Sequence, residues 1–176
     1  MKKNIVIAIL IILVILVAGF FKFKWMLAKN EVADYKNATY QIDTSSITLV
    51  NGRAENETAP GSASKSITQY FGNGVEADFN GDGTNDVAFL LTQDSGGSGT
   101  FYYVALALKT ASGGYRGVNS IFLGDRIAPQ TTEFKDGAII VNFAAHKAGE
   151  AMTARPSVGV SKYFRVQNNQ LIEVKK

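Results

Sequence analysis

Oxygen-bearing side chains recur through the segment 78–86, which reads DFNGDGTND and is called here the acidic loop. Asp78, Asn80, Asp82 and Asp86 stand at loop positions 1, 3, 5 and 9, and the Thr84 carbonyl falls at position 7. A glycine at position 6 permits a sharp turn. A hard cation such as Ca²⁺ takes about six to eight oxygen ligands, and alternate residues of a tight loop supply them.

Two interpretations of the acidic loop are open. It could be an Asx and glycine turn that only caps a hairpin. The three aspartates within these nine residues would then repel one another without compensation. We therefore expect a structural Ca²⁺ ion held by the side chains of Asp78, Asn80, Asp82 and Asp86 and by the carbonyl of Thr84. Phe89 stands at position 12, where an EF-hand has a bidentate glutamate, so the loop is not an EF-hand.

A nucleophilic site is a weaker candidate. Ser98 lies in the run GGSGT, where Thr100 replaces the second glycine of a G-x-S-x-G elbow, so we expect a flexible hairpin loop. His146 is the only histidine, and a triad would need it beside Ser98 and an aspartate such as Asp125. We expect instead an exposed loop histidine, and a turn with a local ion pair at Asp125 and Arg126.

The charges divide the chain in two. Five of the 18 basic residues and none of the 15 acidic ones precede residue 30, which leaves 13 basic against 15 acidic residues and a net charge of −2. The basic balance therefore belongs to the N-terminal segment and gives no argument for nucleic acid. Lysines beside an apolar run are attracted to anionic lipid, so the balance points to a membrane. The absence of cysteine excludes a disulfide framework.

The N-terminal segment predicts a membrane anchor. Residues 5–21 form an uncharged run of 17, which spans roughly 25 Å as a helix, and Phe23, Trp25, Met26 and Leu27 suit the interface. We expect residues 1–28 to anchor the chain in the lipid bilayer through residues 5–27, with a stem at 29–36. A cleavable signal peptide is the alternative, with a secreted product. The MKKN start resembles a bacterial export signal, which favours a single-pass inner-membrane protein whose C-terminal domain lies outside the cytoplasm.

Beyond the stem, the chain shows short β-rich runs between turn residues. Asn51-Gly52, Asp136-Gly137 and Asn168-Asn169 predict hairpin turns. The expected strands cover residues 38–42, 47–50, 53–55, 66–71, 75–79, 86–93, 101–109, 115–123, 131–134, 138–143, 162–166 and 170–174. Short strands at this spacing predict one all-β domain over 37–174, an antiparallel β-sandwich or open barrel of about ten strands. We expect the strand 86–93, apolar on both faces, to be central.

Aromatic residues fall at core spacing in the later strands, namely Tyr102, Tyr103, Tyr115, Tyr163 and Phe164. We expect these side chains to lie in the hydrophobic core. A tyrosine-bearing solvent face that binds a partner is the alternative.

The acidic loop resembles the calcium loops of FG-GAP and VCBS-type β-repeats, in which D-x-N-x-D-G-x-x-D runs into an apolar strand. The resemblance implies ligation by Asp78, Asn80, Asp82 and Asp86 through side chains and by Thr84 through its backbone. Only nine residues match, so the propeller architecture does not carry over. A wider resemblance, over about 100 residues, is to an uncharacterised domain of exported bacterial lipoproteins and membrane-anchored proteins. It is carried by DFNGDGTNDVAFLLTQDSGGSGTFYYVALAL and by IFLGDRIAPQTTEFKDGAIIVNF. In this chain a transmembrane run replaces their lipid-bearing cysteine.

Two functions are open on these grounds. The first is a non-enzymatic, membrane-anchored extracytoplasmic domain that binds or scaffolds in the cell envelope, with an envelope protein or a glycan as partner. The alternative is a cell-wall hydrolase or an inhibitor of one. No set of residues in the sequence makes a convincing catalytic group.

Overall fold

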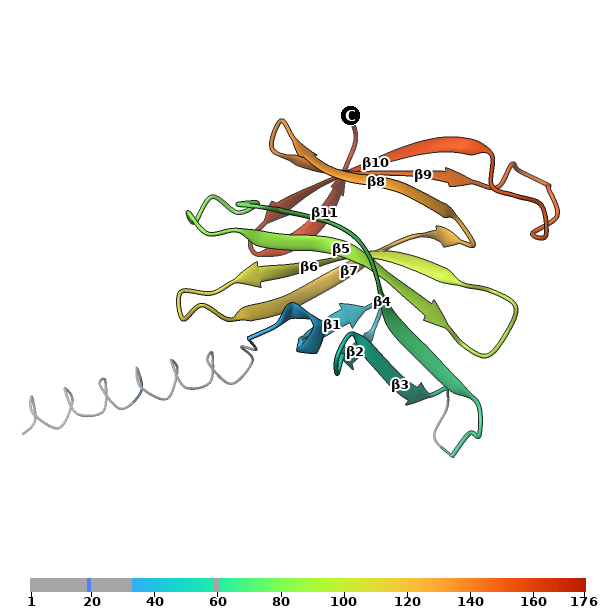
Figure 1. Ribbon diagram of the computed structural model, residues 1–176, viewed down its shortest axis with the longest axis horizontal. Helices are drawn as coiled ribbons and strands as arrows, with labels where there is room; N and C mark the ends of the chain where they lie inside the picture. Colours follow the sequence, from blue (N-terminus) through green and yellow to red (C-terminus); the bar gives the residue numbers. More distant parts are fainter. Residues whose placement is uncertain (1–18, 20–32, 59–60) are drawn as a thin grey trace, which may run out of the picture. The chain divides into compact units, whose positions relative to one another are not determined.

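Strands make up most of the described chain. The computed structural model describes residues 19, 33–58 and 61–176, and these form one 3₁₀ turn and eleven strands (Figure 1). In chain order they are η1 (Tyr35–Asn37), β1 (Thr39–Ile42), β2 (Ser45–Thr48), β3 (Arg53–Glu57), β4 (Lys65–Ala77), β5 (Asp86–Asp94), β6 (Phe101–Lys109), β7 (Tyr115–Asp125), β8 (Ala128–Lys135), β9 (Ala138–Ala145), β10 (Val158–Gln167) and β11 (Gln170–Val174). The expected all-β class is confirmed.

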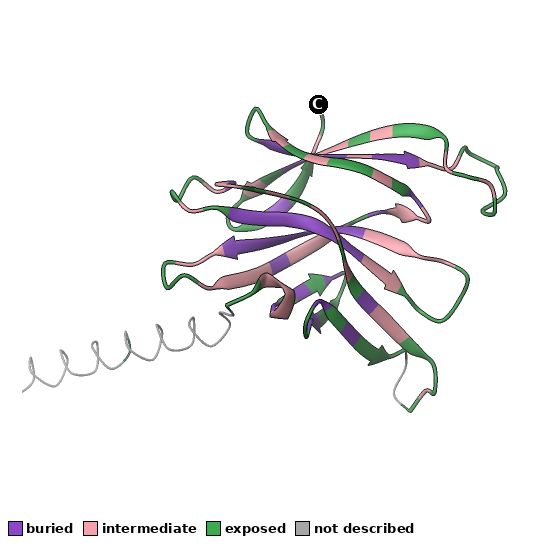
Figure 2. Cartoon of the chain, viewed as in Figure 1, coloured by how far each residue is buried: buried purple, intermediate pink, exposed green. Residues whose placement is uncertain are grey.

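The strands form two sheets. Seven lie in the order β2-β1-β7-β6-β5-β4-β3 and four in the order β11-β10-β9-β8. The four-stranded sheet covers one face of the β4–β7 region, and η1 with β1–β3 lies on the other face (Figure 1). Strand β5 is buried along most of its length, as its apolar run predicts (Figure 2).

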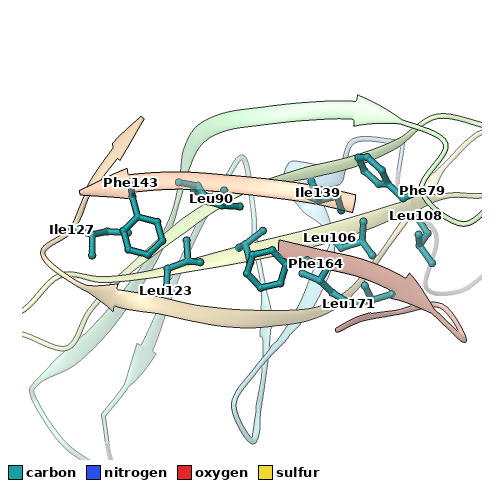
Figure 3. Close-up of a cluster of buried hydrophobic side chains, with 14 residues drawn as sticks. Phe79, Leu90, Leu106, Leu108, Leu123, Ile127, Ile139, Phe143, Phe164 and Leu171 are labelled. Atoms are coloured by element: carbon teal, nitrogen blue, oxygen red, sulfur yellow. The ribbon is translucent and has the colours of Figure 1, made fainter. Parts of the chain in front are cut away.

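Alternation along β5 and β6 sends side chains into two cores. Leu90 and Leu106 belong to the core between the two sheets, where they meet Phe143 and Phe164 of the four-stranded sheet (Figure 3). The intervening residues, such as Phe89, point into a second core under β1–β3. In β6 the first set is large and the second contains Ala105 and Ala107, as the sequence predicts.

Three turns form at the predicted dipeptides. Both residues of Asn51-Gly52, of Asp136-Gly137 and of Asn168-Asn169 have positive φ, between 51° and 80°, as a type I′ turn requires. The last two join β8 to β9 and β10 to β11. The Asn51-Gly52 turn joins β2 to β3, which lie at opposite ends of the sheet order and are not paired with each other. One bridge, between Val50 and Arg53, closes this turn. The seven-stranded sheet therefore bends round until its two edge strands meet at this turn.

The expectation of a wholly antiparallel fold is wrong at one pair. β1 pairs with β7 in parallel, through Gln41 with Asn119 and Ile42 with Ser120. Hairpin neighbours must be antiparallel, but β1 and β7 are far apart in the chain and no hairpin constrains them. Gly117 allows the close approach, because a Cβ atom there would lie 2.3 Å from the Thr39 carbonyl oxygen.

Two expected strands, 66–71 and 75–79, are one strand in the structure. β4 runs through the gap with register shifts between Tyr70, Gly72 and Val75. Gly72 and Asn73 have φ of 102° and 50°, so turn-forming residues here make a bulge instead of a turn.

The predicted anchor, residues 1–28 with its apolar part 5–27, lies outside the described residues except for residue 19. Within the described ranges, no helix is long and apolar enough to cross a bilayer. Part of the predicted stem is described, and there Tyr35 packs on Phe89 with ring centroids 5.3 Å apart. The chain from Val32 to Lys176 forms one unit.

Gly117→Ala should destabilise the domain by about 1–3 kcal/mol, because the added methyl group would force β1 away from β7. Gly159→Ala is the matched control, since Gly159 also lies in a strand and a Cβ there would meet nothing within 4 Å. Urea unfolding of a soluble fragment from residue 30 onward measures both. Equal unfolding free energies for the two variants would contradict the close approach at Gly117.

Candidate functional site

The acidic loop connects β4 to β5, and its last residue is the most buried charged group of the described chain. Asp86 is 0% exposed, and its two carboxylate oxygens accept hydrogen bonds from the backbone N–H groups of Phe79 (3.2 Å) and Lys109 (2.9 Å). Asp86 thereby ties the start of the loop to the end of β6. Phe79 is itself buried between the sheets, with its ring centroid 5.0 Å from that of Phe134 on β8.

Asp78 shapes the loop from the other end. One carboxylate oxygen accepts the N–H groups of Gly81 (2.7 Å) and Asp82 (3.1 Å), and the other accepts that of Gly83 (2.9 Å). Gly81 and Gly83 have φ of 80° and 87°, which turn the backbone so that successive N–H groups point at the carboxylate.

The middle of the loop is closed by Asn80, Asp82 and Thr84. The Asp82 N–H donates to the Asn80 side-chain oxygen (3.0 Å), and the Asn80 amide donates back to the Asp82 carboxylate (3.0 Å). The hydroxyl and N–H of Thr84 donate to the other Asp82 oxygen at 2.6 and 2.9 Å. Hydrogen bonds from the Thr84 hydroxyl and then from Asn80 lower the pKa of the exposed Asp82 carboxyl.

The pKa of the Asp86 carboxyl shifts in the opposite direction. Burial raises the pKa of its carboxyl, the negative charges of Asp82 and Asp78 raise it further, and the two backbone N–H donors oppose the rise. A pKa raised by folding means that the fold loses stability as pH rises through it and Asp86 ionises. A cation near the loop would reduce that loss.

All five predicted ligands thus lie in one loop, but their carboxylates face backbone and side-chain donors of the loop and of β6. Across the part of the chain that the structure describes, no three His, Cys, Asp or Glu side chains are grouped so that they could hold one metal ion. These hydrogen bonds therefore stabilise the neighbouring carboxylates, for which we had expected a cation to be needed. The donor set, all oxygen, is that of a hard cation, and Ca²⁺ binding stays a prediction.

Two of the three triad candidates, Asp125 and His146, each hydrogen-bond to Arg126. Asp125 pairs with Arg126 at 2.7 Å, as predicted, and accepts the N–H of Thr100 at 3.0 Å. His146 is half-buried rather than exposed, because its Nε2 lies 3.2 Å from the Arg126 carbonyl oxygen. Within the described ranges, neither Ser98 nor Asp125 hydrogen-bonds to His146, whose Nδ1 is buried without a partner. Ser98 lies in the β5–β6 loop, as expected.

A concave surface on the second sheet was not predicted. The outward face of β8–β11 and the chain beyond β11 enclose about 580 Å³, here called the basic groove. Its ten lining residues are Lys135, Asp136, Ala138, Ile140, Tyr163, Arg165, Gln167, Val174, Lys175 and Lys176. Four cations thus surround an apolar floor. Tyr163, which core spacing assigned to the interior, faces outward here, whereas its neighbour Phe164 is 0% exposed.

A second concavity, of about 720 Å³, lies on the seven-stranded sheet beside the β1–β2 turn. Its lining is dominated by hydroxyl and amide side chains, with Asp43 and Glu57 as the charged residues. Its wall includes Thr58, next to residues 59–60, which are not described. It therefore offers neither the cations nor the aromatic ring of the basic groove.

Asp86→Asn should lower the unfolding free energy by about 1–3 kcal/mol, because the new amide NH₂ would face one of the two buried N–H donors. Urea unfolding of the fragment from residue 30 measures the change. Asp136→Asn is the control, since Asp136 is exposed and lies in a turn at positive φ that asparagine tolerates. An unchanged or more stable Asp86→Asn variant would mean that repulsion from Asp78 and Asp82 outweighs the two hydrogen bonds.

Comparison of this chain with protein families, curated proteins and solved structures gives no support for either resemblance. The likeness of the acidic loop to FG-GAP and VCBS-type calcium loops accordingly stays a prediction, as does the likeness to the exported bacterial domain. No family model, curated protein or solved structure matches this chain.

Proposed function

We propose that this chain is a non-enzymatic binding or scaffolding domain of the cell envelope, anchored in the membrane by residues 5–27. The observation that carries the proposal is the basic groove, in which Tyr163 and Ile140 form an outward apolar floor and Lys135 and Arg165 stand beside it. Exposed apolar surface rimmed by charged side chains is typical of interaction sites.

The groove and η1 lie on opposite sides of the β-domain. The described chain continues from Ala33 into η1, whose Tyr35 packs on Phe89 on one side of β5. The four-stranded sheet packs on the opposite side of β5, through Leu90. The basic groove, on the outer face of that sheet, therefore faces away from the side at which the chain joins the domain.

A Ca²⁺ ion in the acidic loop would have a structural role in this proposal. The loop joins β4 to β5, contacts the end of β6 through Asp86 and sends Phe79 between the sheets. An ion bound by Asp78, Asn80, Asp82, Asp86 and the Thr84 carbonyl would brace these strands and offset the repulsion at Asp86. Binding requires the carboxylates to exchange part of their present donors for the ion.

Ca²⁺ should raise the melting temperature of the fragment from residue 30 onward. At a 100-fold excess over Kd the stabilisation would be about 2.7 kcal/mol. Asp82→Ala should abolish the gain, whereas Asp136→Ala, in an exposed turn outside the loop, should keep it. Differential scanning calorimetry in chelator and in Ca²⁺ measures the effect. Identical transitions in the two solutions would count against the ion and leave the hydrogen-bonded loop as the complete account.

A photo-crosslinking residue at Gln167, which is exposed and lines the basic groove, should capture a partner in intact cells. The same residue at the exposed Glu150, in the β9–β10 loop, should not capture it. Changing Lys135 and Arg165 to Gln should remove the Gln167 product, because the charges that attract the partner are lost. Equal products at both positions, or none at Gln167, would contradict a binding role for the groove.

A further inference from the structure

We propose that the basic groove binds an acidic polysaccharide, with sugar rings on its apolar floor and carboxylates on its cations. This inference rests on the proposed binding function and names the class of ligand. It comes from the charge and the order of the side chains across the four-stranded sheet.

The charge of the groove is opposite to that of the rest of the domain. Lys135, Arg165, Lys175 and Lys176 line it against one acidic residue, Asp136. None of the four cations is in an ion pair with another residue of the described chain. Residues 30–176 together carry a net charge of −2, so the cations are concentrated here on an otherwise acidic domain. Such a local field attracts anions and disfavours a second copy of the same face.

Strand register aligns the apolar floor into a row. Tyr163 on β10 is opposite Ile140 on β9 and opposite Val174 on β11, so the three side chains stand side by side on the outward face. Neighbouring strands lie about 4.8 Å apart, so the row spans about 10 Å. An aromatic ring between two aliphatic side chains offers a flat apolar strip, which suits the C–H faces of sugar rings.

Two of the four cations, Lys135 and Arg165, occupy the next row along the strands. Lys135 on β8 is opposite Ala138 on β9, and Arg165 is two residues beyond Tyr163 on the same face of β10. The Arg165 guanidinium lies 3.4 Å from the Asp136 carbonyl oxygen, a contact that orients it without neutralising it. A planar guanidinium accepts a carboxylate in bidentate fashion. Lys176 lies over the Tyr163 ring, with its Nζ 5.6 Å from the ring centroid, so another cation is close to the apolar strip.

This pattern favours a polysaccharide over other polyanions. A polyphosphate chain has charges but no apolar face, so it would leave the strip of Ile140, Tyr163 and Val174 unused. Single-stranded nucleic acid binds through stacking of successive bases on several aromatic rings, and the groove contains one. An acidic polysaccharide supplies a carboxylate and an apolar ring face in every repeat.

The test measures binding of polygalacturonate oligomers to the full-length chain in a non-ionic detergent by isothermal titration calorimetry. Lys135→Gln with Arg165→Gln should weaken binding about tenfold or more, and Tyr163→Ala should weaken it by a similar factor. Lys147→Gln with Arg155→Gln is the control of equal charge change, because both residues are exposed and lie in the β9–β10 loop. This control should bind as the unmodified chain does.

Three comparison ligands decide the outcome. Fully methyl-esterified polygalacturonate, inorganic polyphosphate and single-stranded DNA should each bind more weakly than the acid form. The inference would be overturned if polyphosphate or DNA bound as tightly as the acid form of polygalacturonate and if Tyr163→Ala did not weaken that binding. The groove would then be a patch of positive charge without selectivity for sugars. Absence of binding to polygalacturonate would also overturn it, while a groove-dependent crosslink at Gln167 would still support the proposed function. Thermal melting shows whether each variant is folded, and Arg165→Lys, which keeps the charge, tests the bidentate contact separately.

Discussion

Burial of β5 and β6 on both faces is the constraint that organises the domain. Each strand carries apolar side chains on alternate sides, with Leu90 and Leu106 on one face and Phe89 and Ala105 on the other. Both faces must be covered, because exposed apolar area costs about 25 cal/mol per Å². The four-stranded sheet covers the first face, and β1–β3 bend round to cover the second.

The acidic loop lies where these layers meet. Asp86 is driven into the interior by its position at the start of β5, and two backbone N–H donors make its burial tolerable. Asp78 and Asp82 remain at the surface and hold the loop in shape through its own N–H groups. The same arrangement concentrates negative charge at Asp86, so a structural cation and a hydrogen-bonded turn are complementary accounts of one loop.

The basic groove follows from the way the four-stranded sheet is used. Its inner face, with Ile139 and Phe164, completes the core between the sheets, so its outer face is free of any covering layer in the described chain. Alternation along β9 and β10 then obliges Ile140, Tyr163 and Arg165 to face outward. The basic groove therefore lies on a sheet face that takes no part in the core.

Sequence by itself determined the local features of this protein. Dipeptides such as Asn168-Asn169 predicted the turns, where both residues have positive φ. The alternation of large and small side chains predicted β6 from Phe101 to Lys109, and a continuous apolar run predicted that β5 is buried inside the sheet. These succeed because turn preferences and side-chain alternation depend on a few neighbouring residues. The oxygen-rich spacing of the acidic loop was visible for the same reason.

Only the tertiary structure decided which distant strands meet. The parallel pairing of β1 with β7 and the basic groove both join residues far apart in the chain. No local pattern encodes these, because hydrogen bonding between strands is the same for any partner and packing selects among them. Tyr163 was assigned to the core from its residue type, although alternation along β10 places it on the polar face with Ser161 and Arg165. The other face of β10, which carries Phe164, packs against the seven-stranded sheet, and this packing leaves Tyr163 outside the core.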